Sequence, residues 1–408
     1  MRVFCAVRHA NDPRQYFGGL WSGNFYPALQ ALGHEVIESH IDLKPLSDFM
    51  HLPGPFTADV EALRARITEQ ILDEVKQAHH QKPIDLFLSY FYNSHFVPEG
   101  FARLQQWGIP TVNFYCNSLY QFELVDKIAA RVQYAWHAEK PARDAYLRIG
   151  ARPVWVQMAA DPRLYYPVST ERLTRACFIG QRYADRDRWL AALVRHEVPV
   201  DIYGSGWHVE ASKLDPAGAT KPGSPRGSGL STASQHLHRY GYVRGLYRIA
   251  QHWLYRRASS HWMRALQPHV HGRAESIPHT FGRYEVVLNF SNVWADGQPG
   301  SKLIPHVRLR DFEGPMCRTC FITGHTDELA EFYDLGKEVA TYRSIPEFVE
   351  MTKFYLTHPD AAERMRQAGY ERARRDHTWE CRFRQLFKLI GLHERSSVAL
   401  NGHGKVVS

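Results

Sequence analysis

The sequence contains few cysteines, and they are not spaced as a disulfide framework. Six of its 408 residues are cysteine, scattered mostly through apolar, strand-like runs: Cys5, Cys116, Cys177, Cys317, Cys320 and Cys381. This pattern favours reduced thiols in a protein core over paired cystines. Cys317 and Cys320 have the C-x-x-C spacing, but no second pair completes a zinc site, so we expect no metal there.

The sequence also lacks a run of about 18 or more apolar residues, the length that a membrane-spanning helix needs. Met1 leads directly into the apolar run Val3–Val7 without a signal-peptide pattern. We therefore expect a soluble, cytoplasmic protein. A chain of 408 residues exceeds what a single hydrophobic core usually organises, which predicts two domains.

Positive charge is in excess, with a formal net charge of +8. A positive surface suits an anionic partner such as nucleic acid, a sugar nucleotide, a phosphorylated lipid or an acidic membrane face. Charge alone does not choose among these partners.

Short buried strands alternate with helices in both halves of the chain. In the first half, strands are expected at 3–7, 34–37, 84–90, 109–114, 134–137 and 154–157. Helical apolar spacing lies between several of them, as at 25–32 and 60–78. The alternation restarts with strands at 176–179 and 198–203, after turn-forming residues that predict a hinge between Asp161 and Arg172. This order predicts α/β domains with doubly wound parallel sheets.

Polar residues follow the strands of the first half, where ligands bind in open α/β sheets. The candidates are Arg8, His9, Asn11, Gly18, Gly19, Asn93, Ser94, His95, Tyr115, Asn117 and Ser118. His95 and His9 lead as general bases on an acceptor hydroxyl, with Glu123 and Asp126 behind them. The alternative for either histidine is a structurally hydrogen-bonded imidazole.

The first strand of the second half ends in Gly180, followed by Gln181 and Arg182 at a helix entrance. Helix amides and a guanidinium group both favour phosphate oxygens, so this segment is a candidate diphosphate cradle. The alternative is an arginine kept for solubility. Asp185 and Asp187 spell D-x-D, but at a helix start acidic residues offset the helix dipole, and we expect no metal site.

In the stretch Val307–Thr323, the carboxylate Glu313 lies between a polar run and the apolar run Cys320–Ile322. The polar run includes Ser291, Asn292, Gly300 and Ser301. In an alternating α/β chain this place is expected to be a strand-to-helix loop that binds a ligand.

Several motifs occur in a familiar order: Met158–Asp161, Phe178–Gly180 with Arg186 and Arg188, Ile202–Trp207, Val287–Ser291, Arg310–Glu313 and Tyr370–Thr378. In this order they resemble the CgeB-like (spore-maturation-protein-like) glycosyltransferases. The resemblance covers roughly residues 150 to 207 and 282 to 387 and is fainter in the first half.

The resemblance implies a GT-B fold, in which two Rossmann-like doubly wound domains face each other across a cleft and the C-terminal one binds a nucleotide-sugar donor. Glu313 would accept hydrogen bonds from the ribose hydroxyls; the alternative is that it only caps the following helix. The other donor-binding candidates are Gly180, Arg182, Tyr203, Gly204, Ser291, Ser301, Lys302, Arg308, Arg310 and Gly314. The arginines, Lys302 and helix amides near Ser301 and Gly314 would stabilise the leaving diphosphate without a required metal or other cofactor.

Two positions depart from the family pattern. Arg318 stands where the family has glycine, so either the backbone approaches the ligand differently or the arginine contacts phosphate itself. Pro305 stands where the better-known retaining GT-B enzymes carry a second glutamate, so the stereochemical outcome stays open.

A basic insertion at about 208–271 is not explained by the family pattern. Within it, 236–266 carries an apolar stripe with Tyr242, Leu246 and Trp253, and arginines dominate the remainder. A basic helix with such a stripe suits an anionic membrane surface or the diphosphate of a lipid-linked acceptor. The alternative, equally weighted, is a helix packed on its own domain with solvated arginines.

These features predict an acceptor domain at 1–168, a donor domain at 169–376, a helix at 377–393 that crosses back to the first domain, and a flexible tail at 394–408. The expected activity is transfer of a sugar from a nucleoside-diphosphate sugar to a glycan, lipid-linked or protein acceptor, in cell-surface polysaccharide, glycolipid or glycoprotein assembly. UDP, dTDP and GDP stay open as the donor nucleotide. The expected location is the cytoplasm or the inner membrane face. The competing hypothesis is a non-catalytic nucleotide-sugar-binding assembly protein, and no nucleic acid is expected because no recognisable module supports it.

Overall fold

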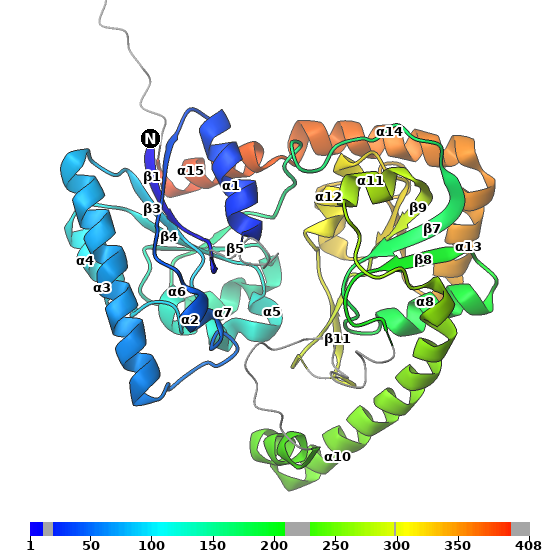
Figure 1. The fold of residues 1–408 in the computed structure, drawn as a ribbon, viewed down its shortest axis with the longest axis horizontal. Helices are drawn as coiled ribbons and strands as arrows, with labels where there is room; N and C mark the ends of the chain where they lie inside the picture. Colours follow the sequence, from blue (N-terminus) through cyan, green and yellow to red (C-terminus); the bar gives the residue numbers. More distant parts are fainter. Residues whose placement is uncertain (11–18, 209–228, 298, 393–408) are drawn as a thin grey trace, which may run out of the picture.

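The computed structural model describes residues 1–10, 19–208, 229–297 and 299–392, and for 229–241 it describes the backbone alone. Two α/β domains lie side by side (Figure 1). Asn11, Gly18 and the predicted tail at 394–408 lie outside the described residues.

The N-terminal domain contains a six-stranded parallel sheet in the order β2-β1-β3-β4-β5-β6. Its strands are β1 Arg2–Ala6, β2 Glu35–Glu38, β3 Leu86–Ser89, β4 Thr111–Tyr115, β5 Tyr134–His137 and β6 Pro153–Trp155. Its helices are α1 Leu20–Ala31, α2 Lys44–Ser47, α3 Ala58–Gln81, α4 Gly100–Gln106, α5 Ser118–Gln121, α6 Asp126–Ala129 and α7 Arg143–Arg148. Because β1, β3 and β4 are buried on both faces, they are short apolar runs, as a covered parallel sheet requires.

The C-terminal domain contains a five-stranded parallel sheet in the order β13-β12-β9-β7-β8. Its strands are β7 Leu173–Ile179, β8 Val200–Tyr203, β9 Tyr284–Leu288, β12 Phe321–Gly324 and β13 Ala340–Tyr342. Its helices are α8 Arg186–Arg195, α10 Gly229–Leu266, α11 Ile277–Gly282, α12 Arg310–Met316, α13 Ile345–Thr357 and α14 Pro359–Asp376. An antiparallel hairpin of β10 Asn292–Trp294 and β11 Leu303–Pro305 extends from it.

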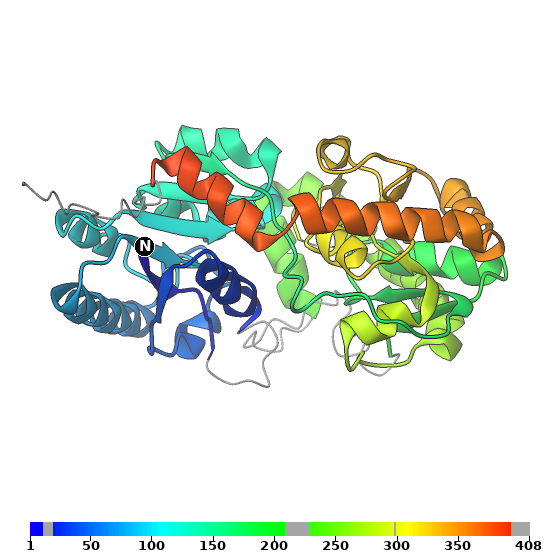
Figure 2. The same cartoon turned by 90° about the horizontal axis from the view of Figure 1, so that it is seen from above.

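The last helix, α15 Trp379–Ile390, packs on the N-terminal domain against α1 (Figure 2). It starts at Thr378, whose hydroxyl accepts a hydrogen bond from the Cys381 amide (3.3 Å). The Trp379 ring is fully buried, and its Nε1 donates to Asn24 Oδ1 of α1 (2.9 Å). The chain therefore crosses between the domains twice, once before β7 and once before α15.

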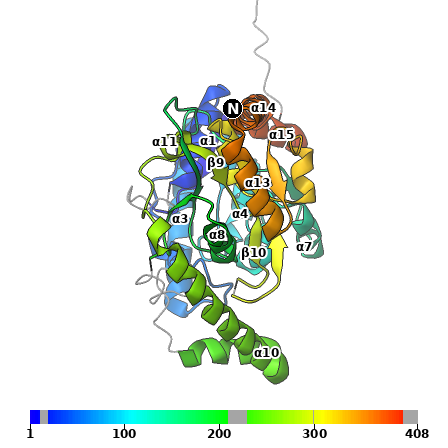
Figure 3. The ribbon, with the colours of Figure 1, turned by 90° about the vertical axis from the view of Figure 1, so that its right-hand side faces the viewer.

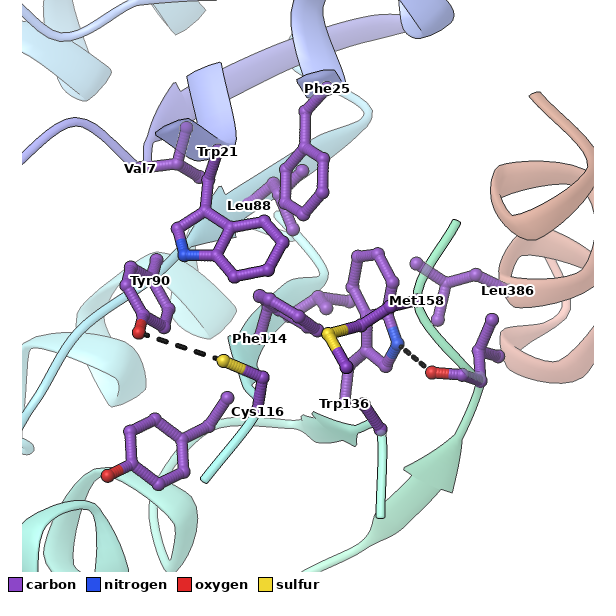
Figure 4. Close-up of a cluster of buried hydrophobic side chains, with 14 of the residues drawn as sticks. Val7, Trp21, Phe25, Leu88, Tyr90, Phe114, Cys116, Trp136, Met158 and Leu386 are labelled. Carbon is purple, nitrogen blue, oxygen red and sulfur yellow. Dashed lines mark hydrogen bonds between the residues drawn. The ribbon is translucent and has the colours of Figure 1, made fainter. Parts of the chain in front are cut away.

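An aromatic cluster fills the N-terminal core beneath α1 and α15 (Figure 4). Trp136 and Phe25 stack at 5.5 Å between ring centroids, and Trp136 Nε1 donates to the Val156 carbonyl (2.8 Å). Trp21 of α1 lies at the edge of this cluster, 4.7 Å from the Phe114 ring. This packing therefore holds Trp21 in place on the side of the N-terminal domain that faces the C-terminal domain.

The two-domain α/β architecture predicted from the alternation is confirmed. All six cysteines are free, and five of them are buried. Within the described residues, no helix is both long enough and apolar enough to span a bilayer, and no group of three metal-ligating side chains occurs.

Candidate functional site

A cleft of about 300 Å³ lies between the two domains. The N-terminal domain contributes Leu20, Trp21, Cys116, Asn117 and Met158, and the C-terminal domain contributes Phe178, Ile179, Gly180, Arg186, Asn289, His306, Arg308, Leu309, Arg310 and Glu313. A cavity of this size is within the range of small-molecule sites. Its polar groups come chiefly from the C-terminal wall.

Three arginines converge on this wall. Arg186 begins α8 and is 9% exposed, with Nη1 donating to the Gln181 carbonyl (2.7 Å). Arg308 precedes α12 and donates from Nη2 to the Asn292 carbonyl (2.7 Å). Burial, with the nearby Arg308 charge, lowers the pKa of Arg186 to about 9. Such repulsion between cations favours binding of an anion among them.

Glu313 is the one carboxylate that lines the cleft among the described residues. It is 2% exposed, and its Oε2 lies 2.7 Å from Nη1 of Arg310, the third arginine. Glu313 lies within α12 rather than in the expected strand-to-helix loop, because Arg310–Met316 forms a helical turn before β12. The helix presents residues three apart on one side, so Arg310 and Glu313 face the cleft together.

A buried network holds this arginine-bearing segment in place. Asp311 accepts hydrogen bonds from the Arg308 amide (2.7 Å), the Thr323 hydroxyl (2.7 Å) and Asn289 Nδ2 (2.9 Å). Burial raises the pKa of Asp311. Asp311 therefore ties the start of α12 to the ends of β9 and β12.

His306 joins the two domains at the floor of the site. Its Nδ1 lies 3.3 Å from Oε1 of Glu139, which follows β5 in the N-terminal domain and is 2% exposed. The other Glu139 oxygen accepts the Leu119 amide (3.0 Å). Burial raises the pKa of Glu139 to about 8, and burial lowers the pKa of His306 well below its usual range. Neither ring nitrogen of His306, nor Oε1 of Glu139, makes a hydrogen bond among the described residues, so the 3.3 Å contact is a close approach of the two groups.

The sequence-predicted residues that the structure brings together at the cleft are Gly180, Arg308, Arg310, Glu313 and Asn117. Arg182 is turned away, because its guanidinium donates to the Ser259 hydroxyl of α10 (2.6 Å) and contacts Asp187 (3.4 Å). Arg186, one helical turn later, points into the cleft in its place.

Gly204 and Gly314 act in packing and do not line the cleft. A Cβ at Gly204, where φ is +131°, would lie 2.2 Å from the Gly180 carbonyl oxygen. A Cβ at Gly314 would lie 2.2 Å from the Phe321 ring. Glycine is required at 204 because the backbone of Gly180 approaches it closely, and at 314 because the Phe321 ring packs against the helix backbone there.

Four further candidates also lie outside the cleft. The Tyr203 hydroxyl contacts the Tyr284 hydroxyl (2.8 Å), Lys302 is exposed in the turn of the β10–β11 hairpin, and Ser301 lies beside it. Ser291 lines a smaller, separate cavity of about 180 Å³ at the carboxyl ends of β9, β12 and β13, where its hydroxyl donates to the Gly324 carbonyl (2.6 Å).

His9 and His95 do not line the cleft. His9 is 7% exposed, and its Nε2 contacts the Tyr90 carbonyl (2.5 Å). His95 is fully buried between the Tyr92 amide and the Ser47 hydroxyl. Burial lowers the pKa of both. Their surroundings are those of structural, hydrogen-bonded imidazoles, and their catalytic role stays a prediction.

Arg318 has a positive φ of 56°, the conformation that glycine adopts most readily. Its guanidinium contacts Glu363 (2.5 Å) and Gln367 (3.1 Å) on α14, away from the cleft. Of the two alternatives for this position, direct contact with phosphate is therefore not the arrangement found.

Comparison with known proteins places this geometry in context. Residues 186–388 match a sequence family described as glycosyl transferase-like. No match was found among curated protein sequences.

Solved structures resemble the whole chain. A sucrose-phosphate synthase from Thermosynechococcus elongatus aligns with a TM-score of 0.56 at 14% identity, covering 96% of this chain and 98% of that one. HepE from Anabaena, in complex with UDP and glucose, aligns with a TM-score of 0.54 at 11% identity, covering 96% and 99%. A glycosyltransferase from Rickettsia africae aligns with a TM-score of 0.54 at 10% identity, covering 95% and 97%. The GT-B arrangement of two Rossmann-like domains is confirmed, and the family match over 186–388 agrees with the predicted class of activity, glycosyl transfer. Neither comparison identifies the CgeB-like subfamily.

Proposed function

We propose that this chain, glycosyl transferase-like over residues 186–388, transfers a sugar from a nucleoside-diphosphate sugar to an acceptor hydroxyl in the interdomain cleft. The observation that carries the proposal is the convergence of Arg186, Arg308 and Arg310 around one buried carboxylate, Glu313. We further propose, as the resemblance implies, a CgeB-like role in assembling cell-surface polysaccharide, glycolipid or glycoprotein.

The three guanidinium groups suit the diphosphate of the donor. When the glycosidic bond breaks, negative charge develops on the diphosphate leaving group, and fixed cations in a poorly solvated wall stabilise that charge. Guanidinium groups also match phosphate oxygens geometrically. The arginines thus stabilise the departing diphosphate more strongly than the bound donor, which accelerates the transfer.

Glu313 suits the ribose. A carboxylate can accept hydrogen bonds from both vicinal hydroxyls, and Arg310 at 2.7 Å holds the Glu313 side chain in place. The HepE structures contain UDP, UDP with glucose, or UDP-glucose. That relative makes UDP the first donor nucleotide to test here, before dTDP and GDP.

On the acceptor side, His306 is our candidate base. Its imidazole is neutral because burial lowers its pKa, so Nε2 can accept the proton of an acceptor hydroxyl as the new glycosidic bond forms. The ionised Glu139 carboxylate would hold the Nδ1 proton and stabilise the resulting imidazolium, in the way that a carboxylate orients histidine in a catalytic triad.

Titration calorimetry with UDP, dTDP and GDP tests the donor site. Wild type should bind one of them, and Glu313→Ala or Arg308→Ala should weaken that binding about tenfold to a hundredfold, the loss expected for a charge-assisted hydrogen bond. Arg318→Ala is the matched control, because Arg318 follows the same helix but contacts α14. Equal affinity of Glu313→Ala and wild type would contradict the ribose assignment.

Donor hydrolysis separates an enzyme from a pure binding protein. We expect wild type to release free sugar slowly from the nucleotide sugar that it binds, and His306→Gln to bind the donor as wild type does. His358→Gln, an exposed histidine outside the cleft, is the control. Tight donor binding without any turnover, in water or with acceptors, would favour the non-catalytic alternative.

A further inference from the structure

Helix α10 extends outward from the C-terminal domain, on the side to which the β10–β11 hairpin points (Figures 1 and 3). Its C-terminal part is anchored: Ser259, Met263 and Leu266 are buried, and Tyr255 donates to Asp187 of α8 (2.8 Å). Arg248 pairs with Asp296 of the hairpin connection at 2.9 Å. The orientation of the helix is therefore fixed by the domain on which it stands.

The opposite face of α10 carries large apolar side chains in solvent. Its members, hereafter the α10 apolar face, are Tyr242 (82% exposed), Val243 (84%), Leu246 (60%), Tyr247 (64%), Trp253 (57%) and Leu254 (59%). At 100° per residue these six lie within about 140° of the helix circumference. The buried residues Arg248, Ser259 and Leu266 lie on the other side. One side of the helix therefore packs on its own domain, as one of the two sequence alternatives held, and the apolar face on the other side is exposed.

The charge of α10 determines what can cover this face. The helix sequence, residues 229–266, contains six arginines and no aspartate or glutamate. Arg256 is exposed beside the edge of the apolar face, and Arg257 and Arg264 are exposed on the same side of the helix, nearer its C-terminal end. The covering surface must therefore be apolar in part and negatively charged around it.

Two occupants from this protein itself fit poorly. A second copy would bring two acid-free, arginine-rich helices together, which like charge disfavours. The segment 209–228 offers only Val209 and Leu214 as large apolar residues. An anionic bilayer surface fits both features, since Tyr and Trp favour the headgroup region and arginines attract acidic lipids.

We propose that the α10 apolar face docks this protein on an anionic membrane surface, with Trp253, Leu246 and Leu254 entering the headgroup–acyl boundary and Arg256 and Arg257 contacting lipid phosphates. The inference does not depend on the proposed glycosyl transfer. It rests on the exposure and charge of α10 alone.

Vesicle flotation at 150 mM NaCl tests it, with phosphatidylcholine vesicles and with vesicles containing phosphatidylglycerol at about 30%. Wild type should float with the anionic vesicles only, and less so at high salt because the charges are screened. The double variants Leu246→Glu/Trp253→Glu and Arg256→Glu/Arg257→Glu should each lose binding about tenfold or more. All four positions are exposed, so the fold should survive, which circular dichroism and thermal melting can verify.

Phe354→Glu/Leu389→Glu is the matched control for added negative charge at exposed apolar positions elsewhere (45% and 54% exposed), and it should float as wild type does. Absence of binding to the anionic vesicles would overturn the proposal. So would equal loss in the control, or unchanged binding of Leu246→Glu/Trp253→Glu. A dimer in sedimentation that Leu246→Glu/Trp253→Glu converts to monomer would assign the face to a second copy instead. Donor binding in calorimetry should be the same in all these variants, so this test and that of the proposed function fail independently.

Discussion

Nδ1 of His306 and Oε1 of Glu139 lie 3.3 Å apart, and the two residues belong to different domains. Both are buried, and burial opposes the charged form of each. The protonation of Glu139 and His306 is therefore coupled to the contact between the two domains.

The first prediction concerns the pH dependence of transfer. Only the ionised Glu139 carboxylate can orient His306 as a base, and burial raises its pKa to about 8. Activity should therefore rise with pH through about 8, as a property of the coupled pair. Glu139→Gln should remove this rising limb and lower kcat by about tenfold to a hundredfold, with donor affinity retained. A profile of kcat against pH that is the same in Glu139→Gln and wild type would contradict the assignment.

A second prediction concerns stability, which should fall as pH rises, whereas activity should rise. The pKa of Glu139 is raised in the folded state, to about 8 from 4.5, so folding takes up a proton between those values. This favourable contribution is complete below about pH 4.5 and is lost as pH rises through about 8. Denaturant unfolding at pH 6 and pH 9 should show a larger decrease in the free energy of unfolding for wild type than for Glu139→Gln. An equal decrease in both proteins would show that Glu139 does not titrate in this range.

Arg318 provides a third prediction. Its φ of 56° costs an ordinary residue about 1 kcal/mol that glycine does not incur, whereas its partly exposed ion pair with Glu363 contributes about 0.5 kcal/mol or less. Arg318→Gly should therefore be at least as stable as wild type, and Arg318→Ala should be less stable than Arg318→Gly by about 1 kcal/mol. Urea unfolding of the three proteins measures this difference. A glycine variant no more stable than the alanine variant would mean that the backbone is not strained there.

Trp379 provides a fourth. Its buried ring contacts Phe25 (4.8 Å between centroids) and Trp21, and its Nε1 bonds Asn24. Trp379→Ala should lower the free energy of unfolding by about 3–5 kcal/mol, through the cavity left in the core. Trp379→Phe keeps much of the volume and loses the hydrogen bond, so it should cost much less. Thermal unfolding of both variants separates the two contributions; similar losses would assign the effect to the hydrogen bond.

The alternation of strands and helices was sufficient to predict the two-domain fold, because the spacing of apolar residues within each segment indicates whether it forms a strand or a helix and which residues are buried. The donor wall was predicted in part for the same reason: Arg308, Arg310 and Glu313 are close in sequence, so one helical turn brings them together. Sequence analysis selected Arg182, whereas Arg186, one helical turn later, is the arginine that reaches the cleft. Which of the two does so depends on where α8 begins and on the hydrogen bond from Arg182 to Ser259 of α10, and neither can be read from the local sequence.

Glu139 and His306 were missed for a different reason. Their contact joins positions 139 and 306, and no local pattern reports it. Glu139 does follow β5, so the rule that sites lie after parallel strands would have included it had it been applied to that strand. The same rule selected His9 and His95, which tertiary packing against Tyr90 and Ser47 removed from the cleft.

The two chain segments that cross between the domains are themselves joined, by a parallel bridge between Ala160 and Thr378 and a hydrogen bond from the Ala160 amide to the His377 carbonyl (3.1 Å). Two crossing segments that are hydrogen-bonded to each other resist twisting between the domains more than a single linker does. We therefore expect the domains to open and close about one axis, so that cleft opening separates Glu139 from His306 and cleft closure restores the pair. The same domain closure would then enclose the substrate and bring Glu139 next to His306.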